Sequence, residues 1–90
     1  MDLDARLRLL EGCHDWQGLV DALEEAIAAE EEPGARARFH LQLARVLAGP
    51  LMQGARALKH FQDAFKLDAS LTEALSEARA VYWQLGKLPM

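Results

Sequence analysis

The 90-residue sequence predicts an all-α fold, and three features of its composition support that prediction. Leu and Ala, two strong helix formers, occur 16 times each. The β-branched residues that sheets favour number only five: Val20, Val46, Val81, Ile27 and Thr72. Apolar residues also recur at steps of three and four, as a helix with one buried face requires. We therefore expect one helical domain over residues 1–90, either complete or as a fragment of a longer protein.

The first half of the chain predicts two helices, over residues 2–12 and 16–31. Gly12 ends the first helix, because glycine tolerates the left-handed turn that follows many helices. Asp15 precedes the second helix, where its carboxylate can accept from free backbone amides. Glutamates 30–32 oppose the helix dipole at the other end of that helix, and Pro33-Gly34 completes the break.

The second half predicts three more helices, over residues 35–48, 54–67 and 71–85. Gly49-Pro50 ends the first of these. Ser70 and Glu73 have the spacing of a capping box, in which each side chain bonds the other's free backbone amide, and it would open the last helix. Every connection is short, so we expect consecutive helices to be antiparallel neighbours. Both an open stack of helical hairpins and a closed helical bundle satisfy these patterns.

Composition and charge exclude several classes of protein. The net charge of −4 argues against nucleic acid and anionic membrane surfaces as partners. A single cysteine, Cys13, excludes an intramolecular disulfide. No apolar run reaches the length of a membrane span, and the acidic first residues differ from a secretion signal. We therefore expect a cytoplasmic protein.

Few side chains in the sequence indicate chemistry. The soft metal ligands are Cys13, His14, His40 and His60, and their spacing resembles no zinc motif. The thiol of Cys13 has an adjacent histidine, but no further residue suggests the oxyanion site that a thiol nucleophile needs. The sequence therefore predicts no metal, no cofactor and no enzymatic activity.

Two alignments of the chain with itself indicate a repeat. A shift of 38 residues places Leu19, Leu23, Ala26 and Ile27 on Ala57, Phe61, Ala64 and Phe65. A shift of 35 residues places His40, Leu43, Ala44 and Leu47 on Leu75, Ala78, Arg79 and Tyr82. A period in the mid-thirties that contains two helices is typical of a helical solenoid.

The pattern Ala57-x3-Phe61-x2-Ala64 resembles the second helix of the tetratricopeptide repeat (TPR). The resemblance covers about residues 16–86, and it departs from the family at Arg79, where the TPR has a small glycine. It implies a stack of helical hairpins that serves as an adaptor or scaffold and binds other proteins without catalysis.

The TPR resemblance also implies that the first helix of each hairpin lines a concave binding face. The residues expected to bind a partner are Arg38, Leu41, Arg45, Ser76, Arg79 and Trp83. Arg38 and Arg45 lie two helical turns apart on one face, where they can hold an acidic and apolar peptide or helix of another protein. The alternative is that these arginines pair with carboxylates of the chain itself.

The end of the chain is rich in apolar residues and predicts a second mode of binding. A helical repeat array usually ends in a cap with a polar outer face. This chain instead carries Val81, Trp83, Leu85, Leu88 and Met90. Self-association through these residues, for example as a homodimer, is therefore the alternative function that the sequence suggests.

Overall fold

The computed structural model describes residues 3–86, in which the backbone forms five α-helices and no β-strand. The helices are α1 (Leu3–Gly12), α2 (Trp16–Ala29), α3 (Pro33–Ala48), α4 (Gly54–Leu67) and α5 (Thr72–Gly86). The all-α prediction is confirmed, and each end differs from its predicted position by at most two residues. None of these helices is long and apolar enough to cross a membrane.

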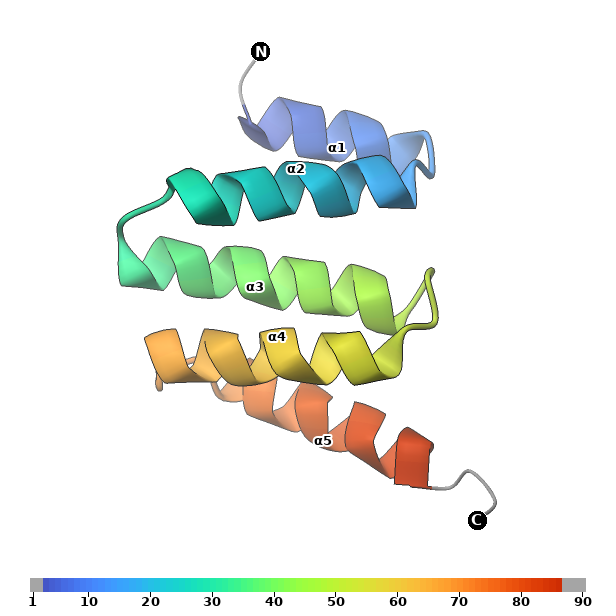
Figure 1. Cartoon of the computed structure of the whole chain (residues 1–90), viewed down its shortest axis with the longest axis vertical. Coiled ribbons are helices and arrows are strands. Elements are labelled where there is room, and N and C mark those ends of the chain that lie inside the picture. The colour runs from blue at the N-terminus through green and yellow to red at the C-terminus, as the bar shows by residue number, and fades with distance from the viewer. Residues whose placement is uncertain (1–2, 87–90) are drawn as a thin grey trace.

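The helices stack one after another with alternating directions, and α1 and α5 lie at opposite ends (Figure 1). Among the described helices, extensive packing joins only those consecutive in sequence, and the α3–α4 pair packs most extensively. The molecule measures 46 × 30 × 17 Å, so it is elongated along the direction in which the helices stack (Figure 1). The arrangement is therefore an open stack and not a closed bundle.

The hydrophobic core runs through the middle of the stack. Helix α3 contributes the largest share of buried residues: Ala37, His40, Leu41, Leu43, Ala44, Val46 and Leu47. The largest fully buried side chains come from α2, α3 and α4: Val20, Leu23, Leu43, Leu47 and Phe61. Helix α3 is buried on more than one face because it packs between α2 and α4.

Two acidic side chains cap helix N-termini. The carboxylate of Asp15 accepts from the backbone amide of Gly18 at 3.1 Å, which confirms the predicted cap of α2. Glu32 caps α3 by accepting from the amides of Gly34 at 3.2 Å and Ala35 at 3.1 Å. Because Pro33 has no amide hydrogen to satisfy, it fits the first position of α3. The prediction that Pro33 lies in a break was wrong.

The predicted capping box at the start of α5 is absent. The Ser70 hydroxyl donates to Asp68 Oδ1 at 2.5 Å, and the Ser70 backbone amide donates to the same oxygen at 3.0 Å. These two hydrogen bonds lower the pKa of Asp68. Helix α5 begins only at Thr72. Asp68 therefore accepts from the Ser70 backbone amide, which a capping box would pair with the side chain of Glu73.

Candidate functional site

One face of the stack, which we call the groove face, carries three hollows. The first, of about 210 Å³, is lined by residues of α1, α2 and α3. The other two, of about 350 and 310 Å³, are lined mainly by residues of α3 and α5. Arg45 lines all three hollows, and Gln42 lines the first and second. The middle helix therefore connects the hollows into one surface.

Arg45 is held by two carboxylates of α5. Its Nε donates to Glu77 Oε1 at 2.9 Å, and its Nη2 donates to Glu77 Oε2 at 2.7 Å. The same Nη2 reaches Glu73 Oε2 at 3.2 Å. These interactions, led by the hydrogen bond to Glu77, raise the pKa of Arg45. The structure therefore shows, for Arg45, the alternative in which the arginine pairs with carboxylates of the chain.

The other residues expected to bind a partner differ in their exposure and in the hollows that they line. Arg38 is exposed and lines the second hollow. Leu41 lines the same hollow but is only 5 % exposed, because it belongs to the core; its expected outward position is wrong. Ser76 and Arg79 are exposed on α5 and line none of the three hollows. Trp83 is also exposed on α5.

The residues expected to mediate self-association are only partly described. Val81 is buried in the core, so it does not contribute to an outer surface as expected. Tyr82 and Trp83 are 70 % and 66 % exposed. The side chain of Leu85, and Leu88 and Met90 as a whole, lie outside the described part of the chain.

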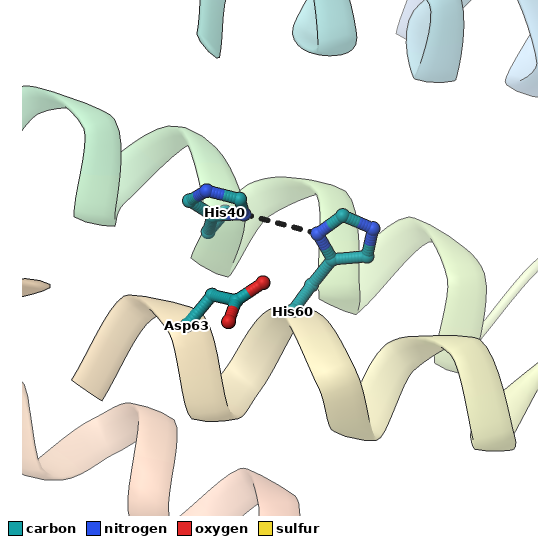
Figure 2. A group of neighbouring side chains, drawn as sticks. All are labelled: His40, His60 and Asp63. Carbon is teal, nitrogen blue, oxygen red and sulfur yellow. Dashed lines mark hydrogen bonds between the residues drawn. The ribbon is translucent and has the colours of Figure 1, made fainter. Parts of the chain in front are cut away.

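A second cluster joins α3 to α4 and was not predicted from the sequence. Figure 2 shows His40 on α3 facing His60 and Asp63 on α4. The two Nδ1 atoms are 3.0 Å apart, at hydrogen-bond distance, and the ring centroids are 5.2 Å apart. One ring nitrogen of each histidine and one carboxylate oxygen of Asp63 lie within 4.8 Å of one another. His40 is buried, whereas His60 and Asp63 are half-buried.

Burial is the main cause that lowers the pKa of both histidines. The neighbouring His60 lowers the pKa of His40 further, while the carboxylate of Asp63 acts in the opposite direction on both rings. The 3.0 Å separation requires one Nδ1 to donate and the other to accept. Two protonated rings would place two donors face to face, so the geometry disfavours a positive charge on both histidines at once.

The sequence contains part of the signal for this cluster. His60 and Asp63 are three residues apart, so they share a face of α4. His40 is twenty residues earlier, and its neighbours in the α3 pattern are apolar. Helical periodicity predicts which face of each helix is buried, but it does not define which turn of α3 lies beside which turn of α4.

The remaining chemical candidates lie together in the turn between α1 and α2. Cys13 is exposed, and the His14 ring stacks on Trp16 with centroids 5.4 Å apart. The histidine ring is therefore packed against an indole in this turn.

Comparison of the chain with protein-family models, with curated proteins and with solved structures finds no match. The resemblance to the TPR remains a prediction from the sequence.

Proposed function

We propose that the chain is a non-catalytic protein-interaction module whose groove face binds a peptide or helix of another protein. The observation that carries the proposal is the sharing of Arg45 by three hollows on one side of an open stack. A closed bundle would fill such hollows with its own helices, whereas an open stack leaves them for an occupant.

The lining of the hollows suggests the chemistry of that occupant. Apolar residues of α1, α2 and α3 line the first two hollows, together with the residue just before α5; they include Leu7, Trp16, Leu23, Phe39 and Leu71. The charged centre consists of Arg45, Glu73 and Glu77. Apolar pockets around a polar centre are typical of surfaces that bind through a few anchor side chains.

The pairing of Arg45 changes the expected charge of the partner. One guanidinium faces two carboxylates, so the positive charge of Arg45 is already compensated within the chain. The prediction of an acidic partner from the sequence assumed that Arg38 and Arg45 are free cations. We instead propose a segment that inserts apolar side chains into the hollows, with polar contacts at their shared centre.

Peptides selected from a display library against the full chain test this proposal. Gln42→Trp places a large side chain at an exposed position that lines two of the hollows. We expect it to weaken binding of the selected peptides about tenfold or more, because the indole takes the space of their anchors. Circular dichroism checks that the helices are retained.

The matched control is Gln62→Trp, at an exposed position of α4 that lines a different hollow, between α4 and α5. It should leave peptide binding unchanged. Equal loss in both variants, or a library that yields no binding peptide, would contradict a binding site on the groove face.

Self-association is a second candidate, supported by the exposed aromatic pair Tyr82 and Trp83 on α5. Light scattering over a range of concentrations should then show a dimer or larger species. Trp83→Glu should convert it to a monomer, whereas Gln84→Glu, at the next exposed position, should not. A wild-type chain that remains monomeric at every concentration would exclude this function.

A further inference from the structure

The cluster of His40, His60 and Asp63 takes no part in the groove face and has its own chemistry. Its donor set consists of two imidazole nitrogens and a carboxylate oxygen, supplied by two different helices. Imidazole and carboxylate together suit zinc and similar divalent transition-metal ions. Three protein donors leave one position of a tetrahedral ion for water or for another side chain.

The distances fit such an ion after small side-chain rotations. Donors at about 2.0–2.1 Å from a tetrahedral zinc ion lie about 3.3–3.4 Å from one another. The two Nδ1 atoms, at 3.0 Å, are already close to that separation, and the complete donor set spans no more than 4.8 Å. The helices that carry the three residues, α3 and α4, form the most extensively packed pair in the described stack, which holds the donors near one another.

The charges around the cluster come from three helices. The carboxylate of Asp63 on α4 raises the pKa of both rings, and that of Glu24 on α2 raises the pKa of His60, so negative charge favours a cation at the cluster. Arg36 on α3, with Arg56 and Lys59 on α4, acts in the opposite direction. The carboxylate of Asp63 is within ligand reach of both rings, so a negative charge lies where a cation would bind.

We propose that His40, His60 and Asp63 form a binding site for a divalent transition-metal ion, namely Zn²⁺. The bound ion would link α3 to α4. Water takes the fourth position. On binding, the ring that donates through Nδ1 transfers that proton to its Nε2, so both Nδ1 lone pairs face the ion. The proposal does not depend on the function of the groove face.

Calorimetric titration of the full, metal-free chain with Zn²⁺ tests the site. We expect saturable binding of one ion per chain at neutral pH. His60→Gln should weaken it by more than about 100-fold and Asp63→Asn by at least about tenfold, since even groups behind the ligands contribute 10–100-fold. His14→Gln, which changes the exposed histidine beside Cys13, is the control and should leave the affinity unchanged.

Thermal unfolding separates a metal site from a histidine pair that only forms a hydrogen bond. Zn²⁺ should raise the Tm of the wild-type chain, a chelator should reverse the rise, and His60→Gln should abolish it. This change in Tm is measured against the same variant without metal, so a destabilised variant still gives a clear result. The absence of one-to-one binding, or wild-type affinity in both ligand variants, would overturn the proposal.

Discussion

The α3–α4 hairpin and the helix α1 differ sharply in how they are held. Helix α3 contributes seven buried residues, and its packing with α4 is the most extensive in the described stack. Among the side chains described in α1, only that of Leu7 is buried, and α1 packs chiefly on α2. An open stack therefore concentrates its stability in the middle, where a helix has neighbours on both sides.

The largest expected effect comes from the middle of the stack. Phe61 is 1 % exposed, so Phe61→Ala leaves a cavity in the core where its ring packs. We expect the free energy of unfolding to fall by about 3–5 kcal/mol. Urea denaturation followed by circular dichroism measures this change. A loss below about 1 kcal/mol would show that the α3–α4 hairpin is not the centre of stability.

A smaller and more local effect is expected in α1. Leu7→Ala should cost about 2 kcal/mol, the lower end for a buried leucine, because this residue lies at the edge of the core. Hydrogen exchange should increase in α1 and hardly change in α3 and α4, since α1 can detach without opening the other helices. Faster hydrogen exchange in all helices of Leu7→Ala would show that α1 does not open independently of α3 and α4.

The helix caps give effects of about 1 kcal/mol or less. Asp15→Ala removes the acceptor for the Gly18 amide and should cost about 1 kcal/mol at the start of α2. Ser70→Ala should stay within about 0.5 kcal/mol, because the Ser70 hydroxyl bonds Asp68 and caps no helix. Urea midpoints of the two variants measure this difference. A larger loss of stability in Ser70→Ala would indicate that Ser70 caps α5, as the sequence pattern predicted.

The smallest expected effect is the change in the free energy of unfolding with pH, which again depends on residues in the middle of the stack. Burial lowers the pKa of His40 and His60 in the folded chain, while unfolded histidines keep their ordinary value of 6.5. Below that value the unfolded chain binds more protons, so stability is complete above pH 6.5 and falls as the pH decreases further. Urea denaturation between about pH 7.5 and 5.5 measures the decrease.

Variants of single histidines test whether the two rings cause this pH dependence. The rings face Glu24, Arg36, Arg56, Lys59 and Asp63. His60→Gln removes one of the two titrating rings and should flatten the pH dependence, whereas His14→Gln should leave it unchanged. Equal pH dependence in wild type and His60→Gln would show that groups other than these histidines take up the protons on unfolding.

The sequence predicts the elements of this fold better than it predicts their relations. Periodicity and breakers located all five helices because helix formation depends on residues a few positions apart. Leu41 was placed on the concave face by the register of the TPR resemblance, whereas the packing of α3 between α2 and α4 buries it. Likewise, Arg45 and Glu77 meet across helices, and their contact depends on how two helices align.

The His40–His60 contact shows the same limit most clearly. Its two rings are twenty residues apart, and only the axial alignment of α3 with α4 brings them to 3.0 Å. Ser70 shows a different limit, since a capping pattern does not reveal that Asp68 accepts from the backbone amide that the pattern pairs with Glu73. A candidate site built across helices therefore becomes visible only in three dimensions.

Packing between sequence neighbours also has a consequence for how the chain acquires its structure. Each described helix finds its main partner in the adjacent helix, so the loops that must close are short and their entropy cost is small. Chains dominated by such local contacts fold within microseconds to milliseconds. During synthesis, α2 can pack on α3 before α5 has left the ribosome, and the stack can grow in the order in which it is translated.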